Sequence, residues 1–302
     1  MSEVSAVKFG LVLEGGAMRG LFSAGAMDSL MEAGIKFDGI IGVSAGACFG
    51  CNYKSGQIGR TLRYNKLLAN DSRYCSLKSL IKTGDLFGAD FCYREVPEVI
   101  DPFDNEAFEK NPTEFYLVAT DCNSGEPVYK KLTSSRGDCY EWMRASASMP
   151  IVSRPVRIDG LTLLDGGLSD ALPLAYFEGL GFKKNVVITT RPYGYRKKPS
   201  RFTPMAKPFL AKYPKIYQSL KMRHHGYNNA ISYLEKQEAS TSKANCRQSP
   251  PSSFRGVRPI LPPPLKPSAD LLGINPKNGS CRLIITICDN SFEPGKFNCP
   301  ST

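Results

Sequence analysis

One serine in the sequence stands where nucleophilic catalysis would place it. Residues 42–46 read GVSAG, and the apolar run DGIIGV leads directly into Ser44. A serine on a tight turn between a strand and a helix holds its hydroxyl exposed in a strained backbone conformation, and such a turn needs small neighbours. The pattern predicts a nucleophile, although a structural turn that simply requires Gly42 and Gly46 would give the same letters.

A second stretch that could do chemistry is EGGAMRG, residues 14–20. It follows an apolar run and opens a helical pattern, so its backbone N–H groups would lie at a helix N-terminus, where they favour negative charge. Such groups stabilise the oxyanion of an acyl-transfer intermediate or bind a phosphate. The stretch fits neither a P-loop nor G-x-G-x-x-G, so nucleotide binding is the weaker interpretation, and a plain glycine turn is the structural alternative.

An aspartate completes the set. LLDGG, residues 163–167, places Asp165 at the end of an apolar run, in an Asp-Gly pair that is also common in turns. Ser44, the 15–20 loop and Asp165 each follow a predicted strand, and the carboxyl ends of parallel strands meet at one edge of a sheet. We therefore expect a nucleophile, oxyanion donors and a carboxylate base to converge there, with burial raising the proton affinity of the aspartate.

The elements that would position these residues alternate between strands and helices. Short apolar runs predict the strands, and apolar residues at helical spacing predict the helices. The predicted strands span 6–14, 38–43, 114–120, 126–132, 160–165 and 184–190, and the predicted helices span 19–34, 45–56, 138–148 and 172–181. This order predicts an α/β fold, a three-layer α/β/α sandwich with a mostly parallel central sheet.

The ordered set EGGAMRG, GVSAG and LDGGLSD resembles the patatin-like phospholipase family, and MRASASMPIVSRPVRIDG and ALPLAYFEGLG add to the similarity. The resemblance covers about residues 6–190, and residues 191–238 resemble the bacterial cytosolic branch of the family. It implies a lipid acyl hydrolase, of the phospholipase A or carboxylesterase type, that uses a Ser–Asp dyad without a histidine. By that resemblance Ser44 is the nucleophile and Asp165 the base. The sequence shows no cluster of ligand residues, so no metal or organic cofactor is expected.

The same resemblance assigns the oxyanion loop to Gly15, Gly16, Ala17 and Arg19. The glycines that support the three motifs are Gly20, Gly42, Gly46, Gly166 and Gly167. Ala17 departs from the family pattern, which usually has a third glycine at this position; if the residue needs a positive φ, alanine costs about 1 kcal/mol in strain. The alternative functions are an acyltransferase with the same dyad and a non-catalytic module that binds a phosphate or a lipid head group.

Positive charge is concentrated in one region. The chain has a net charge of +11, and residues 191–238 hold 11 basic and two acidic side chains, interleaved with tyrosines. This segment leads into a predicted long helix, 215–238, and is either a solvated face or a surface that docks on an anionic membrane. No nucleic-acid motif accompanies it, so the expected partners are a lipid or small ester substrate and a membrane surface, and no nucleic acid is expected.

Composition divides the chain into three parts. These are a catalytic core (1–190), a basic helical extension (191–238) and a divergent tail (239–302) rich in proline, serine and cysteine. In the tail only 282–289 resembles a strand, and we expect most of it to be poorly ordered. The N-terminus lacks the apolar stretch of a signal peptide and no apolar run spans a membrane, so the sequence predicts a cytoplasmic protein whose membrane contact is peripheral.

Histidine and cysteine offer less chemistry. His224 and His225 sit side by side in the basic helix, where a helix-face role is favoured over catalysis. Cys48 and Cys51 form a lone C-x-x-C directly after Ser44. We interpret them as buried structural thiols rather than as a redox or metal site.

Overall fold

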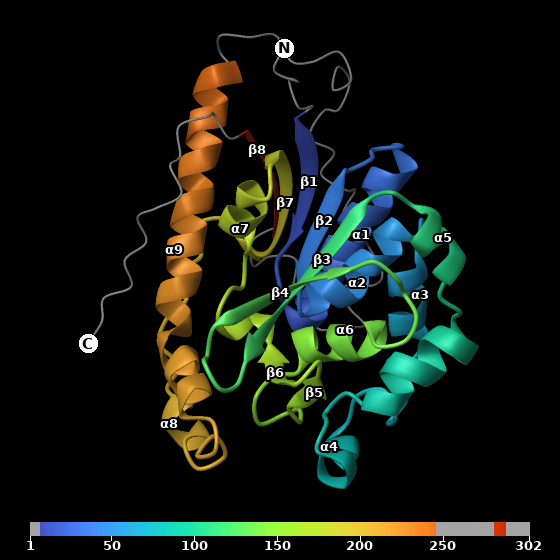
Figure 1. Cartoon of the computed structure of the whole chain (residues 1–302), viewed down its shortest axis with the longest axis vertical. Helices are drawn as coiled ribbons and strands as arrows, with labels where there is room; N and C mark the ends of the chain where they lie inside the picture. Colours follow the sequence, from blue (N-terminus) through green and yellow to red (C-terminus); the bar gives the residue numbers. More distant parts are fainter. Residues whose placement is uncertain (1–6, 246–280, 288–302) are drawn as a thin grey trace.

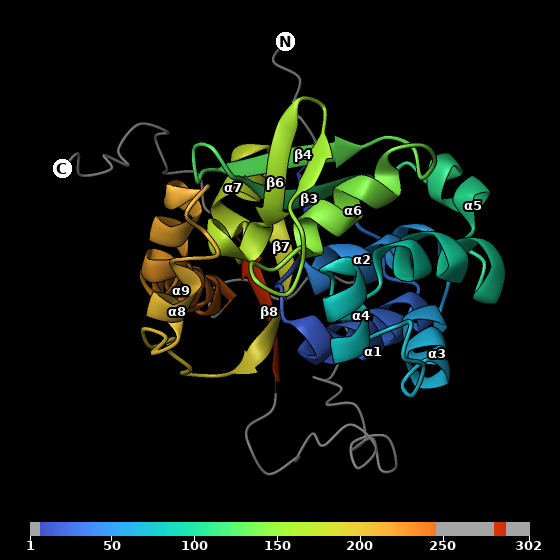
Figure 2. The same cartoon turned by 90° about the horizontal axis from the view of Figure 1, so that it is seen from below.

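The computed structural model describes residues 7–245 and 281–287. Its centre is an eight-stranded sheet in the order β5-β6-β3-β2-β1-β7-β8, with β4 paired to β3 beside this path (Figure 1). The strands are β1 (Lys8–Leu13), β2 (Gly39–Val43), β3 (Glu114–Asp121), β4 (Pro127–Leu132), β5 (Val156–Ile158), β6 (Leu161–Asp165), β7 (Phe182–Pro192) and β8 (Cys281–Ile287). Helices cover both faces of the sheet, as Figure 2 shows, and confirm the predicted α/β/α sandwich.

The helices follow the predicted order and add several that were not predicted. The α-helices are α1 (Gly20–Glu32), α2 (Ala45–Lys54), α3 (Arg60–Leu67), α4 (Leu77–Thr83), α5 (Asn105–Lys110), α6 (Cys139–Ala147), α7 (Leu174–Gly179), α8 (Thr203–Ala206) and α9 (Pro214–Asn245). A π-helix, η2 (Phe91–Ile100), and two 3₁₀ turns, η1 (Ala17–Arg19) and η3 (Gly166–Leu168), complete the set in the described residues.

The two faces of the sheet pack against different helices, because consecutive residues of a strand point to opposite sides. In β1, Leu11 and Leu13 pack with side chains of α1, α2 and α6, whereas Val12 packs with side chains of α7 and α9. All three residues are fully buried. Strands buried on both faces read as continuous apolar runs, which is why the sequence revealed them.

The strand directions correct one prediction. Strands β7, β1, β2 and β3 are parallel to one another, as expected, but β4, β6 and β8 run antiparallel to the strands that they flank. The strand before Asp165 is β6, so the prediction that it joins the parallel set is wrong. The chain enters β6 through a short hairpin from β5, so β6 runs opposite to β5, and it also runs opposite to β3 on its other side.

The predicted long helix is α9, which covers one face of the sheet through Tyr227, Ile231 and Leu234. The strand predicted near the end of the chain is β8, which pairs with β7. The rest of the tail, 246–280 and 288–302, lies outside the described residues, and so does the expectation that it is poorly ordered. Within the described residues, no helix combines the length and the apolar character needed to cross a membrane.

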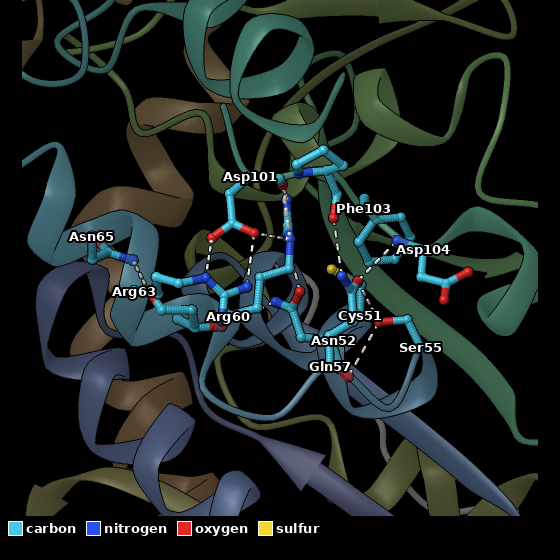
Figure 3. A network of polar contacts seen from close by, with 12 residues as sticks. Cys51, Asn52, Ser55, Gln57, Arg60, Arg63, Asn65, Asp101, Phe103 and Asp104 are labelled. Atoms are coloured by element: carbon cyan, nitrogen blue, oxygen red, sulfur yellow. Dashed lines mark hydrogen bonds and ion pairs between the residues drawn. The ribbon is translucent and has the colours of Figure 1, made fainter. Parts of the chain in front are cut away.

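Residues 57–113, for which the sequence predicted no element, form a helical cap built of α3, α4, η2 and α5. Figure 3 shows the polar network that fixes it. Arg60, only 4% exposed, donates to the Asp101 carbonyl and to Oδ1 of Asn52 on α2. Arg63 donates to both oxygens of the Asp101 carboxylate at 2.8 Å. A buried guanidinium needs such partners, and here they tie the cap to α2.

Candidate active site

Ser44 lies at the turn that joins β2 to α2. Its φ of 56° and ψ of −122° are a strained conformation for a residue with a side chain. The flanking glycines permit the turn, since a Cβ on Gly42 would lie 2.4 Å from the Gly46 carbonyl oxygen, and one on Gly46 would lie 2.5 Å from the Leu13 carbonyl oxygen. The Ser44 amide donates to Oγ of Ser146 at 2.9 Å, which fixes the turn. Such a strained serine is typical of a nucleophile.

Asp165 ends β6 and is 1% exposed. Its Oδ1 accepts a hydrogen bond from the Gly167 amide at 2.7 Å, whereas Oδ2 has no hydrogen-bond partner among the described residues. Burial raises the pKa of this carboxyl above its usual range, and Arg223 and the Ser44 hydroxyl partly oppose the rise. The result is a carboxyl with one free oxygen and increased proton affinity, the properties that a general base needs.

The sheet register brings Ser44 and Asp165 to the same height. Val43 pairs with Val118, so the next residue, Ser44, is level with Ala119, and Asp165 pairs with Ala119 from the other side. Strands lie about 4.8 Å apart, so the two residues face each other across one strand. The Ser44 hydroxyl lowers the pKa of Asp165, so the two side chains are close. The hydroxyl does not, however, form a hydrogen bond of normal geometry with Oδ2. Catalytic pairs often tighten only when substrate binds.

The glycine loop packs directly on Ser44. A Cβ on Gly15 would lie 3.2 Å from the Ser44 Cβ, and one on Gly16 would lie 2.5 Å from Oγ1 of Thr190. The Arg19 amide closes the loop by donating to the Gly16 carbonyl, and the amides of Gly16 and Ala17 donate no hydrogen bond within the described residues. Free amides beside a nucleophile can serve as oxyanion donors.

Ala17 has a φ of 48°, in the left-handed region that favours glycine. Position 17, where the family usually has glycine, therefore does need a positive φ. The alanine carries a strain of about 1 kcal/mol there. Arg19 follows in η1, where its charged neighbours are Arg191 and Glu14. Its side chain thus belongs to a group of charges at the end of β7.

The remaining motif glycines allow close approaches around the pair. A Cβ on Gly166 would lie 2.2 Å from the Val118 carbonyl oxygen of β3. One on Gly20 would lie 2.9 Å from the Ala45 Cβ, and one on Gly167 would lie 3.0 Å from Oδ1 of Asp165. Side chains at these positions would crowd β3, α2 and Asp165 itself, which explains why glycine recurs there.

Ser44 lines a cavity of about 340 Å³. Most of its wall consists of apolar and aromatic side chains from α2, the cap and α6, and Ala17 and Met18 of the glycine loop line it too. Representative lining residues are Cys48, Phe49, Tyr93, Val96 and Met143. An apolar cavity beside a nucleophile can hold an acyl chain.

Sequence reasoning missed two residues that support the site. Oγ of Ser146 accepts from the Ser44 amide and donates to the Val118 carbonyl at 2.6 Å, so it links α6 to both strands. Nε of Arg223 donates to the Gly167 carbonyl at 2.6 Å. Ser146 lies within the MRASASMP stretch that carried part of the resemblance, whereas Arg223 was one positive charge among many in the basic helix, and no local pattern distinguished it.

The histidines make their contacts within α9. Nδ1 of His224 lies 3.0 Å from the Lys221 carbonyl oxygen, and the rings of His224 and His225 are 4.0 Å apart. Cys48 and Cys51 are free thiols, and burial raises the pKa of both, that of Cys48 to about 11. They are therefore protonated at neutral pH, as structural thiols are. Across residues 7–245 and 281–287, no cluster of three or more His, Cys, Asp or Glu side chains is arranged to hold a metal ion.

Fold and site together define a class: α/β/α proteins with a serine on a strand–helix turn and a glycine loop beside it. The family model described as patatin-like phospholipase matches residues 11–178, more than half of the chain. The chain therefore belongs to the patatin-like phospholipase family, as the resemblance predicted.

Several curated proteins are similar to part of the chain. An uncharacterized NTE family protein of Mycobacterium tuberculosis is 29% identical over 185 residues, which are 61% of this chain and 49% of that protein. The uncharacterized protein YjjU of Escherichia coli is 29% identical over 195 residues, 61% of this chain and 52% of that protein. Lysophospholipase nte1 of Aspergillus oryzae is 29% identical over 177 residues, 57% of this chain and 11% of that protein. The chain thus spans about half the length of its bacterial relatives.

Proposed function

We propose that this protein hydrolyses carboxylic esters of lipids through an acyl-enzyme intermediate, with Ser44 as the nucleophile and Asp165 as the base. The observation that carries the proposal is the shared height of the two residues, one in a strained turn and the other a buried carboxyl with a raised pKa. Membership of a phospholipase family, and similarity to a protein named lysophospholipase, support the choice of lipid esters.

In the first half of the reaction, ionised Asp165 accepts the proton of the Ser44 hydroxyl as Oγ attacks the acyl carbonyl carbon. Negative charge develops on the carbonyl oxygen, where the free amides of Gly16 and Ala17 and the N-terminus of α2 stabilise it. The ester C–O bond then breaks, and Asp165 returns the proton to the departing alcohol oxygen. The acyl group stays on Ser44.

In the second half, Asp165 takes a proton from water, and the resulting hydroxide attacks the acyl-serine carbonyl. The bond to Oγ breaks, Oγ regains the proton from Asp165, and a fatty acid leaves. One carboxyl with one free oxygen serves both halves, so the scheme needs no histidine. The apolar cavity holds the acyl chain throughout.

We further propose that the protein works at an anionic membrane surface. Phe202, Met205 and Phe209, in and around α8, are 67–75% exposed and stand within the basic segment 191–238. Helix α4, at the same end of the molecule in Figure 1, adds exposed Leu77 and Ile81. Exposed apolar side chains among basic ones suit the interface of an anionic bilayer. Vesicles with phosphatidylglycerol should bind more tightly at low salt than pure phosphatidylcholine vesicles, and equal binding would refute the idea.

Turnover of p-nitrophenyl butyrate by four proteins tests the hydrolase. Wild type should be active, Ser44→Ala and Asp165→Ala should not, and a His224→Ala/His225→Ala variant should retain activity. Activity that survives in Ser44→Ala would end the proposal. Activity lost with the histidines but kept in Asp165→Ala would overturn the dyad.

The two alternative functions predict other outcomes. An acyltransferase would pass the acyl group to an added alcohol or lysolipid, so the main product would change from free acid to a new ester. A head-group-binding module would show no turnover, and its affinity would be the same in wild type and Ser44→Ala.

A further inference from the structure

Four basic side chains gather around Asp165 and the glycine loop without lining the cavity. They are Arg19 in η1, Arg191 in β7, Lys197 in the loop after β7, and Arg223 in α9, and we call them the cationic ring. None of the four forms an ion pair with a carboxylate within the described part of the chain. Arg196, the residue before Lys197, differs from them because it pairs with Glu235.

Aromatic contacts connect one half of the ring. The Arg191 guanidinium lies 4.5 Å from the centre of the Tyr195 ring, which is 6.0 Å from the Tyr227 ring. Nζ of Lys197 lies 4.4 Å from the centre of the Tyr227 ring. The backbone N–H and C=O of Lys197 are both hydrogen bonded to the side chain of Asn228, at 2.8 and 3.0 Å. Arg191 and Lys197 are therefore held in place by α9 and by aromatic rings.

Arg223 connects the other half of the ring to the dyad. It lies one helical turn before Tyr227 and donates to the Gly167 carbonyl at 2.6 Å. Gly167 lies between Arg223 and Asp165. A Cβ on Gly167 would lie 3.2 Å from Nη2 of Arg223 and 3.0 Å from Oδ1 of Asp165. The ring thus begins next to the catalytic carboxyl and ends at the glycine loop, where Gly16 packs on Thr190, the residue before Arg191.

Positive charge exceeds negative charge in this group. The carboxyl groups that act on these cations are Glu14 and Asp165, and burial raises the pKa of both. Burial, and then the neighbouring Arg223, lower the pKa of Lys197 to about 8. Cations held together with too little opposing charge favour the binding of an anion.

We propose that the cationic ring is the subsite for the phosphate of a glycerophospholipid. The proposal rests on the proposed function: with the acyl chain in the cavity and the ester at Ser44, the alcohol part of the substrate extends past Asp165. In a glycerophospholipid that part carries a phosphate only a few bonds from the ester. Guanidinium groups bind phosphate bidentately and an ammonium binds it as a point charge, so the ring makes the enzyme prefer phosphate-bearing lipids to neutral acylglycerols.

A kinetic comparison tests this preference. The substrates are hexanoyl lysophosphatidic acid and monohexanoylglycerol, which share an acyl chain and are short enough to stay monomeric, so membrane docking does not contribute. Lys197→Met keeps an unbranched side chain beside Tyr227 and removes the charge, and Lys198→Met makes the same change at an exposed neighbour. Lys197→Met should raise the KM for the phosphate-bearing substrate roughly tenfold and leave the KM for the neutral substrate unchanged. Lys198→Met should change neither, and an equal effect of Lys197→Met on both substrates would overturn the proposal.

If the protein hydrolyses neither substrate, the proposed function fails but the phosphate subsite is still untested. A binding measurement tests the subsite in that case. Titration calorimetry with glycerol 3-phosphate and with inorganic phosphate should show binding to wild type and to Lys198→Met, and roughly tenfold weaker binding to Lys197→Met. Absence of glycerol 3-phosphate binding to wild type would overturn the proposal. Binding of inorganic phosphate without any preference for the phosphate-bearing ester would overturn the head-group role.

Discussion

The two faces of the sheet give the Ser44–Asp165 pair opposite surroundings. On the face covered by α2 and the cap, apolar side chains enclose a cavity, whereas on the face covered by α9 the cationic ring lies beside Asp165. The glycine loop contributes a residue to each of these surroundings, because Ala17 lines the cavity and Arg19 belongs to the cationic ring. If both proposals hold, the cavity recognises the acyl chain and the cationic ring recognises the head group, so the two preferences should change independently on mutation.

The largest effect should come from the pair that both faces share. Asp165→Asn keeps the shape and removes the base, so kcat/KM for every ester should fall by about 10³-fold, with no difference between phosphate-bearing and neutral substrates. Steady-state rates on the two hexanoyl esters measure this. A loss confined to one substrate would mean that Asp165 acts in recognition rather than in the chemical step.

The same substitution should stabilise the fold, with a defined pH dependence. Because the folded-state pKa of Asp165 is raised, the folded protein holds this proton at pH values where the unfolded chain has lost it. Ionisation of Asp165 therefore lowers stability as pH rises above about 4. Asp165→Asn should gain on the order of 1–2 kcal/mol over wild type at pH 8 and little at pH 4, by denaturant unfolding. A gain that is equal at both pH values would contradict the raised pKa.

Wild-type activity should follow the same group. The proposed reaction needs ionised Asp165, so kcat/KM should fall as pH drops through its raised pKa, at a pH clearly above the value of about 3.9 for an ordinary aspartate. A rate profile with p-nitrophenyl butyrate between pH 4 and 9, in steps of about half a unit, locates this limb. A profile that stays flat down to pH 4 would exclude Asp165 as the base.

Next in size is the network that fixes the cap. Arg60→Met leaves Asn52 and Asp101 without their buried partner, and should cost about 3 kcal/mol in the free energy of unfolding. Arg63→Met, whose side chain is 56% exposed, should cost under about 1 kcal/mol. Urea unfolding of both variants gives the comparison, and similar costs would show that the network is not anchored by Arg60.

A smaller effect should separate the cavity from the cationic ring. Cys48→Phe fills part of the cavity, so the ratio of rates for p-nitrophenyl dodecanoate and butyrate should fall about tenfold. Cys75→Phe, at an exposed cysteine outside the cavity, is the matched control. The preference for the phosphate-bearing ester should not change in Cys48→Phe. If chain-length and head-group preferences shift together, the two faces do not act separately.

The smallest effect should come from Ala17, in the glycine loop between the cavity and the cationic ring. Ala17→Gly removes a side chain from a left-handed position and should stabilise the fold by up to about 1 kcal/mol. The turnover number should stay within about threefold, since the backbone amide is unchanged. Thermal unfolding and ester turnover check both parts, and a loss of stability would mean that the Ala17 methyl contributes more by packing than it costs in strain.

The central strands and the three motifs could be predicted because their signals are local. The run GIIGV is apolar throughout, since both faces of β2 are buried, and GVSAG is a recognisable pattern because Gly42 and Gly46 lie within two residues of Ser44. The convergence of Ser44 with Asp165 was expected from the order of the strands and from the family resemblance, because neither motif alone contains it. The direction of β6 was predicted wrongly because an apolar run looks the same in either direction, and only its antiparallel pairing with β3 in the folded protein settles it.

The cap and the cationic ring escaped prediction for a different reason. The cap is held by long-range polar contacts such as Arg60 with Asp101, and its helices are short, so neither periodicity nor composition reveals it. Lys197 and Arg223 lie in the basic segment 191–238. The sequence predicts a single surface for all the positive charge of that segment, either solvated or docked on a membrane. Only the packing of α9 on the sheet brings these two side chains to Asp165.

The central claim is that Ser44 is the nucleophile that Asp165 activates. Fluorophosphonate labelling of the intact protein, followed by peptide mass spectrometry, tests it most directly in wild type, Ser44→Ala and Asp165→Asn. We predict one phosphonyl group on Ser44 in wild type, none in Ser44→Ala, and labelling slowed by about 10³-fold in Asp165→Asn. Label on any other residue, or labelling that persists in Ser44→Ala, would contradict the account.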